Sequence, residues 1–326
     1  MQVQTAEVTI VTSPCHLCGG EHVSVLSTRS RDGGELRTVI CSDCGLVWSD
    51  PFPHNARKFY EEEYRLNYKK TYEPKAKHVL RAGKVALTRH EKIKHLLANP
   101  QTMLDVGTGG GEFAYLLKSL GHNIQGIEPN KGYGEYSAAE YGLQLQHGFI
   151  QEGEFEPESF DLITIWHVLE HTEDPFFVVN KLRSLLKPEG ILVVEVPNME
   201  ATCQSPISTF HEAHLYNFNL ATLRKLGEKA GLIEERHLFS EDGGNVTLFF
   251  KKAANLPDAQ ADWTIAGNAE RISNIYKAHT NLKHYLGMAP YLRFVRRMSR
   301  SLLEKNAVKG FANNKSLLDG LYKDLL

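Results

Sequence analysis

The chain has 326 residues, which is long for one domain, so two domains with a smaller appendage are expected. Its hydrophobic content of 42% and charged content of 23% are ordinary for a soluble globular protein. A formal net charge of -2 excludes the overall polycationic character of many nucleic-acid binders. No uncharged apolar run approaches the roughly 20 residues that cross a bilayer, and residues 1–14 lack the pattern of a secretory signal peptide. We therefore expect a cytoplasmic protein without a membrane span.

Four of the five cysteines form two matched pairs near the N-terminus. Cys15 and Cys18 make one C-x-x-C pair, Cys41 and Cys44 make the other, and a glycine follows each pair. In a reducing compartment, clustered cysteines are more often metal ligands than disulfides. Two such pairs supply four thiolates for one tetrahedral Zn2+, which is a structural site with no open coordination position. A redox C-x-x-C pair and incidental cysteines are the alternatives.

The segments around and after these pairs have simple local patterns. Strand-like residues at 23–26 and 36–40 flank the turn sequence Asp32-Gly33-Gly34, which predicts a β-hairpin. After a proline-punctuated exit, aromatic residues at helical spacing predict a helix and linker; they either pack between domains or form part of a substrate wall. A further helical pattern covers residues 75–97 and ends at Asn99-Pro100. The aromatic residues are Phe59, Tyr60, Tyr64, Tyr68 and Tyr72.

From residue 103 short apolar strands alternate with amphipathic stretches. This alternation predicts a mostly parallel sheet covered by helices on both faces, a doubly wound α/β fold. The expected strands are 103–106, 123–127, 161–166, 191–196 and 246–251, and the expected helices are 112–120, 176–186 and 220–230. After residue 252 the pattern becomes helical and basic.

A glycine-rich turn links the first of these strands to a helix. Its pattern is D-x-G-x-G-x-G from Asp105 to Gly111, and its glycines allow a ligand to approach the backbone and meet amide donors. The dinucleotide fingerprint G-x-G-x-x-G/A, aligned from Gly107, would need a small residue where Glu112 stands. Asp105 suits a cationic amino-acid tail, and Glu128 at the end of the next strand suits ribose hydroxyls. The turn therefore favours S-adenosylmethionine over a dinucleotide.

Four motifs in order resemble the class I S-adenosylmethionine-dependent methyltransferase superfamily. They are D-V-G-T-G-G-G, G-I-E-P, F-D-L-I-T-I-W-H-V-L-E-H-T-E-D-P and L-K-P-E-G-I-L-V-V-E-V-P-N, within residues 100–252. The resemblance implies a Rossmann-like sheet of seven strands. It also implies contacts to the methionine part, the ribose, the adenine and the flank of the cofactor. The residues carried over are Asp105, Gly107, Thr108, Gly109 and Gly111, then Glu128 and Pro129, then Phe149, then Trp166 and His167.

The cysteine pairs extend the resemblance to one branch of that superfamily. With Trp48, Asp50-Pro51 and Phe59-Tyr60-x-x-x-Tyr64, they resemble bacterial methyltransferases in which a zinc ribbon precedes the catalytic domain. Members act on deoxysugars, polysaccharides and other secondary metabolites. Relatives that C-methylate nucleotide sugars have a larger C-terminal domain than this chain. The predicted domains are a zinc ribbon (1–55), a helical linker (56–98), a cofactor-binding domain (99–252) and a helical C-terminal extension (253–326).

The segment after the strand at 191–196 carries the candidate catalytic residues. The run F-H-E-A-H-L-Y-N-F at residues 210–218 resembles the H-E-H-L or R-H-L-Y-x-F segment of this branch. Methyl transfer to a hydroxyl or C–H nucleophile needs alignment and proton removal, for which histidine has a suitable pKa. We expect His214 to act as base, assisted by His211, Glu212 and Tyr216. The alternatives are that this segment only anchors a loop, or that His211, Glu212 and His214 bind a metal.

The leading hypothesis is methylation of a small polar metabolite, at oxygen or carbon. A second hypothesis is RNA methylation, with phosphates held by the zinc ribbon and the basic C-terminal helices. A third is a cofactor-binding scaffold that docks on another protein. The N-terminal module is not basic, which disfavours nucleic-acid binding. The intact glycine loop disfavours a scaffold without activity. The chain could also form a homodimer. The helical arginines of the RNA hypothesis are Arg293, Arg296, Arg297 and Arg300.

Overall fold

A computed structural model describes residues 13–53, 74–258 and 260–326, except for the side chains at 294, 296–297 and 300–302. The aromatic residues at 59, 60, 64, 68 and 72 and much of the expected linker therefore lie outside the described residues. The chain forms two compact units. Unit 1 comprises 1–56, 166–184 and 191–290, and unit 2 comprises 57–165, 185–190 and 291–326. None of the helices within the described ranges has the length and apolar character needed to cross a membrane.

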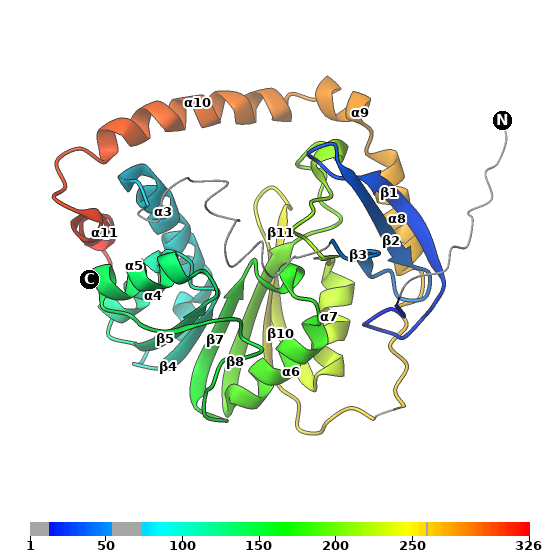
Figure 1. Ribbon diagram of the computed structural model, residues 1–326, viewed down its shortest axis with the longest axis horizontal. Coiled ribbons are helices and arrows are strands. Elements are labelled where there is room, and N and C mark those ends of the chain that lie inside the picture. Colours follow the sequence, from blue (N-terminus) through cyan, green and yellow to red (C-terminus); the bar gives the residue numbers. More distant parts are fainter. Residues whose placement is uncertain (1–12, 54–73, 259) are drawn as a thin grey trace. The chain divides into compact units, whose positions relative to one another are not determined.

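The principal sheet has seven strands in the order β10-β11-β8-β7-β4-β5-β6 (Figure 1). Parallel pairing joins β4 to β5 and β7, and β5 to β6, while β11 is antiparallel to β8 and β10. This confirms the expected doubly wound, mostly parallel α/β fold. The strands are β4 (Thr102–Val106), β5 (Asn123–Glu128), β6 (Gln144–His147), β7 (Phe160–Trp166), β8 (Leu186–Pro197), β10 (Leu232–Phe239) and β11 (Asn245–Lys252).

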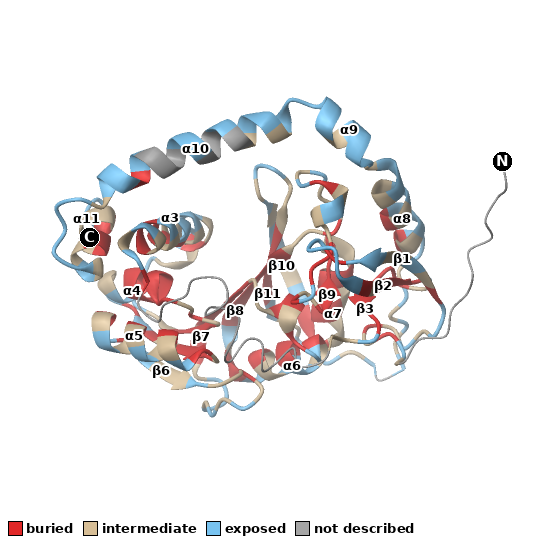
Figure 2. Cartoon of the chain, turned by 45° about the horizontal axis from the view of Figure 1, so that its top comes forward, coloured by how far each residue is buried: buried red, intermediate tan, exposed pale blue. Residues whose placement is uncertain are grey.

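The central strands are the most buried part of the described chain, as Figure 2 shows for β7, β8 and β11. Continuous runs of Val, Ile and Leu in β7 and β8 explain this burial, because strands covered on both faces lose the alternation of polar and apolar residues. Each such side chain contributes about 1.5–3 kcal/mol when it is fully buried.

The helices follow the predicted order, with α5 as an addition. α7 begins with a capping box, in which Asn219 and Thr222 exchange side-chain and backbone hydrogen bonds. The strands β6 and β10 were not predicted either. α5 contains two glycines and little amphipathic pattern, β6 is short, and β10 is interrupted by charged residues. The helices are α3 (Ala76–Ile93), α4 (Glu112–Ser119), α5 (Lys131–Tyr141), α6 (Pro175–Leu185), α7 (Leu220–Lys229), α8 (Asn268–Ala278), α9 (Asn281–Leu286), α10 (Ala289–Ala307) and α11 (Asn314–Tyr322), with 3-10 turns at Lys94–Leu96, Leu169–His171 and Pro206–Ser208.

A second, four-stranded sheet lies in unit 1. Its order is β1 (Val23–Arg29), β2 (Glu35–Cys41), β3 (Val47–Ser49) and β9 (Tyr216–Asn217), all antiparallel. β1 and β2 form the predicted hairpin. β9 follows directly after the histidine-containing segment at 211–214, so that segment is tied to the sheet of the cysteine module.

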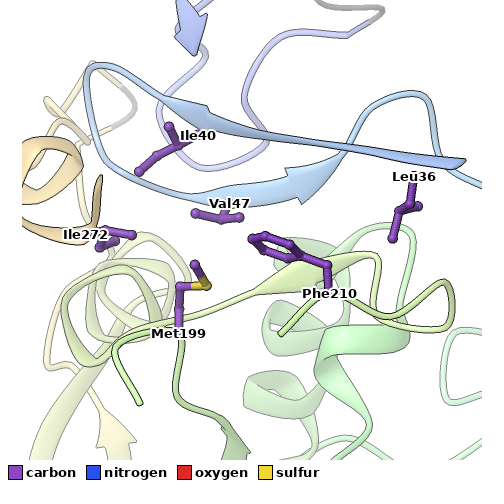
Figure 3. Packing of buried hydrophobic residues seen from close by; sticks show 6 residues of the cluster. All are labelled: Leu36, Ile40, Val47, Met199, Phe210 and Ile272. Carbon is purple, nitrogen blue, oxygen red and sulfur yellow. The ribbon is translucent and has the colours of Figure 1, made fainter. Parts of the chain in front are cut away.

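A hydrophobic cluster fixes the cysteine module within unit 1 (Figure 3). Leu36, Ile40 and Val47 from β2 and β3 point towards residues of three other segments, which Figure 3 shows side by side. All six side chains are buried, so their packing stabilises the hairpin against the segment after β8 and against α8. The partners are Met199, Phe210 and Ile272.

Candidate active site

The glycine loop between β4 and α4 has the backbone geometry of a ligand cradle. Gly107, Gly109 and Gly111 have φ values of 73°, 62° and 84°, which favour glycine. A Cβ at Gly111 would also lie 2.6 Å from the Cβ of Ser137. Thr108 closes the turn by donating its hydroxyl to the carbonyl of Asp105 at 3.0 Å.

Asp105 presents a buried carboxylate at the end of β4. It is 1% exposed, and its Oδ1 accepts a hydrogen bond from the Thr164 hydroxyl at 2.7 Å. Its Oδ2 has no hydrogen-bond partner among the described residues. Burial raises the pKa of Asp105 to about 6, against a smaller opposing effect of Arg89. A buried carboxylate oxygen in this position fits a cationic group of a ligand.

Glu128, at the end of β5, is also buried and is held by backbone donors. Its Oε2 accepts from the amide of Gly109 at 2.7 Å, and its Oε1 accepts from the amide of Asn130 at 3.0 Å. Each carboxylate oxygen has a second lone pair that can accept from a hydroxyl. Asp105, the glycine loop and Glu128 thus supply donors and acceptors within unit 2. Pro129 follows Glu128 directly and Phe149 lies after β6, and both residues are half-buried.

The chain turns sharply at the end of β7, where Trp166 is the last strand residue. Trp166 is buried, and the next residue, His167, has a φ of 55°, which is uncommon for a residue other than glycine. The imidazole of His167 lies between two buried carboxylates: its Nδ1 is 3.4 Å from Glu170 Oε1 and its Nε2 is 3.3 Å from Glu195 Oε1. Burial opposes its charge, yet hydrogen bonds to both acids raise the pKa of His167 to about 9. His167 is therefore an imidazolium near neutral pH.

Two further histidines, His171 and His214, also lie near Glu170. His171 Nδ1 donates to the carbonyl of Ala213 at 2.6 Å, which fixes the loop that carries His214. The rings of His171 and His214 are 4.9 Å apart. One donor atom from each of Glu170, His171 and His214 lies within 4.8 Å of the others, so this set could take a cation. The imidazolium of His167 already supplies positive charge to Glu170, and we interpret the set as a charge network.

Burial keeps His214 uncharged near neutral pH, so its ring can accept a proton, but the same burial makes it a weak base. Its pKa is lowered to about 3, mainly by burial and then by His171. His211 has a pKa lowered to about 4 by burial and by Arg31, and its Nδ1 accepts from the amide of Ala213 at 2.9 Å. Glu170 remains ionised, because the charges of His171 and His167 outweigh its burial and lower its pKa to about 2. At neutral pH, both His211 and His214 are uncharged, and His214 lies beside the buried carboxylate of Glu170.

A cavity of about 270 Å³ within unit 1 brings these residues to a common space. His167, His211 and His214 all line it, together with polar residues of the segment after β8 and of the turn before β11. Two residues predicted to assist catalysis lie elsewhere. Glu212 is exposed and faces Gly34, and the hydroxyl of Tyr216 is hydrogen-bonded to His16 Nδ1 and to the carbonyl of Glu173.

Known proteins match the part of the chain that carries this site. A family described as "Methyltransferase domain" matches residues 75–233. Residues 75–233 are therefore similar to a methyltransferase domain. A probable S-adenosylmethionine-dependent methyltransferase of Mycolicibacterium smegmatis is 25% identical over 186 residues, which cover 55% of this chain and 71% of that protein. The ubiquinone biosynthesis O-methyltransferase of Paraburkholderia xenovorans is 29% identical over 146 residues, covering 42% and 60%.

Among solved structures, an S-adenosylmethionine-dependent methyltransferase from Mesorhizobium loti is similar with a TM-score of 0.44 and 13% identity; the match covers 50% of this chain and 96% of that one. The sequence relatives match over only part of their length, from 71% down to 42%. The matched methyltransferase domain begins after the four-cysteine module.

The four cysteines of that module are close together in unit 1. Cys15 Sγ is 3.5 Å from Cys44 Sγ, and Cys18 Sγ is 3.5 Å from Cys41 Sγ. Four thiolates at about 2.3 Å from a tetrahedral Zn2+ would be about 3.8 Å apart, so the cluster fits this ion closely. The trailing glycines, Gly19 and Gly45, have positive φ and donate their amides to the first cysteine of each pair.

The sequence indicated the histidines but missed the acids that surround them. Glu195 lies within the apolar strand β8, where it accepts from the Thr247 hydroxyl, and Glu170 lies within a motif noted only for its histidines. A charged residue in the middle of a run of valines is rarely buried without a partner. That pattern could have identified Glu195 as part of the site.

Proposed function

We propose that the chain transfers a methyl group from S-adenosylmethionine to oxygen or carbon of a small polar metabolite, such as a sugar, a glycan precursor or a natural-product intermediate. In this proposal the acceptor binds in the unit 1 cavity and His214 is the base. The observation that carries it is a mostly polar cavity of suitable size that is lined by the half-buried, uncharged ring of His214. Transfer to oxygen is the first possibility to test, because the ubiquinone biosynthesis relatives are O-methyltransferases.

The unit 2 residues fit the cofactor. The sulfonium supplies the activated methyl group. The buried Oδ2 of Asp105 suits the cationic amino-acid end of the cofactor, and Glu128 suits the ribose. The glycine amides at the start of α4 suit the carboxylate of the methionine part. Trp166 ends β7 and His167 follows it, and the resemblance implies that both flank the cofactor.

The cavity residues then deal with the proton of the acceptor. An acceptor hydroxyl donates a hydrogen bond to the neutral ring of His214 and passes its proton there as its oxygen takes up the methyl group. The resulting imidazolium lies beside Glu170, whose charge already raises the pKa of His214 against the effect of burial. His171 holds the loop through the carbonyl of Ala213. Tyr216 and Glu212 take no direct part in this step; they help to fix the conformation of the loop that carries His214.

Replacement of His214 tests the base assignment. We expect His214→Ala to retain S-adenosylmethionine binding and to lose about 10²–10⁴-fold in transfer. The measurement is the formation of S-adenosylhomocysteine with a panel of hydroxylated metabolites. His237→Ala is the matched control, because His237 is a histidine on β10 that does not line the cavity. Equal transfer by His214→Ala and by the wild type would rule out His214 as the base.

We further propose that the N-terminal module is a structural zinc ribbon, which places the chain in the zinc-ribbon branch of these methyltransferases. The close approach of four thiols supports this proposal. Zinc would hold both knuckles, and the carbonyl of Cys44 accepts from the Asn268 side chain at 2.8 Å, which connects the site to α8. Metal analysis of the purified protein should give one zinc per chain, and Cys41→Ser should lower that value. A chain that is folded and free of zinc would contradict the proposal.

A further inference from the structure

The last helix of the chain, α11, packs within unit 2 beside α3, α4 and α5 (Figure 1). Its residues Leu317, Leu318 and Tyr322 are buried. A Cβ at Gly83 of α3 would lie 2.7 Å from Leu318 Cδ2, so α3 and α11 are in close contact. The C-terminal extension therefore returns to the part of the chain that carries the glycine loop.

Two tyrosine hydroxyls join α11 to the first turn of α4. The buried Tyr322 donates its hydroxyl to the carbonyl of Glu112 at 3.0 Å, and the hydroxyl of Tyr115 donates to Asp319. Glu112 is the first residue of α4 and directly follows the glycine loop. The proposed function assigns the amides at this helix start to the carboxylate of the cofactor. α11 thus holds the end of α4 that would bind the cofactor.

α11 also holds α5, the helix that begins shortly after Glu128. The side chain of Asn314 donates to the hydroxyl of Tyr136 at 2.7 Å. The amide of Lys315 donates to Glu140 Oε1 at 3.0 Å. One helix from the C-terminal extension is therefore bonded to both helices that lead away from the proposed cofactor residues.

Aromatic rings fill the space between these helices. The ring centroids of Tyr115 and Tyr141 are 4.9 Å apart in a stacked arrangement, and those of Tyr115 and Tyr322 are 6.4 Å apart. A Cβ at Gly111 would lie 3.3 Å from Tyr141 Cδ2, so the aromatic rings reach the glycine loop itself. Because close-packed interiors transmit strain, a change at Tyr322 should be felt at Gly111.

We infer that Tyr322 is a positioning residue for S-adenosylmethionine. Its hydroxyl fixes Glu112, and thereby the amides at the start of α4, in the orientation that binds the carboxylate of the cofactor. The inference rests on the proposed function, since it concerns the same cofactor. A coupling of this kind is reciprocal, so binding of the cofactor should in turn strengthen the docking of α11.

Calorimetric titration of the full chain with S-adenosylhomocysteine tests the first consequence. Tyr322→Phe keeps the ring and removes the hydroxyl, and it should weaken binding about 2- to 10-fold, as expected for the loss of one neutral hydrogen bond. Tyr276→Phe is the matched control, because it removes a hydroxyl from a half-buried tyrosine of α8 in unit 1. This control should bind like the wild type. Urea unfolding of each variant establishes that the titrations are made on folded protein.

Hydrogen exchange tests the second consequence, which a merely structural tyrosine would not produce. S-adenosylhomocysteine should slow the exchange of the α11 amides in the wild type and slow it less in Tyr322→Phe, with the amides of α8 unchanged in both.

Equal affinity of Tyr322→Phe and the wild type, or exchange in α11 that S-adenosylhomocysteine does not change, would overturn the inference while the proposed function stands. Absence of binding by the wild type would instead remove the proposed cofactor site, and this inference with it. A failure of the His214 assignment would leave both readouts as expected here.

Discussion

Replacement of Glu170 by glutamine removes one carboxylate from the network and leaves its shape intact. The Glu170 side chain is 1% exposed, and its pKa lies at about 2 compared with 4.5 for the ordinary group. Because the folded-state pKa is depressed, Glu170 contributes stability above pH 4.5, and that contribution is lost as the pH falls through 2. A shift of about 2.5 units corresponds to about 3 kcal/mol, and loss of one member of a buried pair costs a similar amount.

The same replacement should change His167. The pKa of His167 lies at about 9 compared with 6.5, so its charge contributes stability below pH 6.5 that is lost as the pH rises through 9. The two contributions describe one interaction and are not additive. We therefore expect Glu170→Gln to lower the free energy of unfolding by about 2–3 kcal/mol between pH 5 and 8, with the difference shrinking above pH 9.

Urea unfolding at pH 5, 7 and 9.5 measures this difference, and NMR titration of the His167 ring measures its pKa. The expected pKa in Glu170→Gln is lower than in the wild type, because one of its two carboxylate partners is gone. Glu234→Gln is the matched control, since Glu234 pairs with Arg224 and His237 outside the cavity. A change in unfolding free energy below about 0.5 kcal/mol, together with an unchanged His167 pKa, would refute the reasoning.

Three other predictions concern the pH dependence of transfer, the stability effect of Asp105 and the binding of RNA. The rate of methyl transfer should be constant from about pH 5 to 8 and fall as the pH rises through 9. His214 stays neutral above its pKa of about 3, and His167 loses its proton near pH 9. A transfer rate that still climbs at pH 10 would contradict this. Asp105→Asn should raise the free energy of unfolding at pH 7 by up to about 3 kcal/mol, because burial raises the pKa of Asp105 to about 6 and the charged form is destabilising, as urea unfolding would show. RNA should bind weakly to the full chain, with equal affinity for Arg293→Gln in a filter-binding assay at 150 mM salt; a large loss in that variant would favour the RNA hypothesis.

Sequence patterns predicted the parts of this protein that depend on neighbouring residues. The glycine loop, the hairpin around Asp32-Gly33-Gly34 and the paired cysteines each have a local signature, and the structure contains all three. Strands of buried apolar residues, such as β7, were also predicted within a residue or two of their ends. In each case the physical cause is local: a positive φ, a turn or an apolar run.

Contacts between distant segments could not be predicted in this way. β9 has two residues and pairs with β3 across about 170 positions of sequence, so no periodic pattern marks it. Tyr216 illustrates the consequence. Its position in the histidine segment suggested an assisting role, but its pairing in β9 places its hydroxyl against His16. Tyr322 was missed for the same reason, since its hydrogen bond to the carbonyl of Glu112 joins residues 210 positions apart.

The most direct test of the central claim is the affinity of S-adenosylmethionine for three forms of the full chain, measured by isothermal titration calorimetry. The wild type and His214→Ala should bind it with affinities equal within about twofold, because His214 acts on the acceptor. Asp105→Asn should bind it about 10- to 100-fold more weakly, because the proposal places the cationic end of the cofactor against its buried carboxylate. Absence of binding by the wild type, or equal binding by Asp105→Asn, would contradict the account.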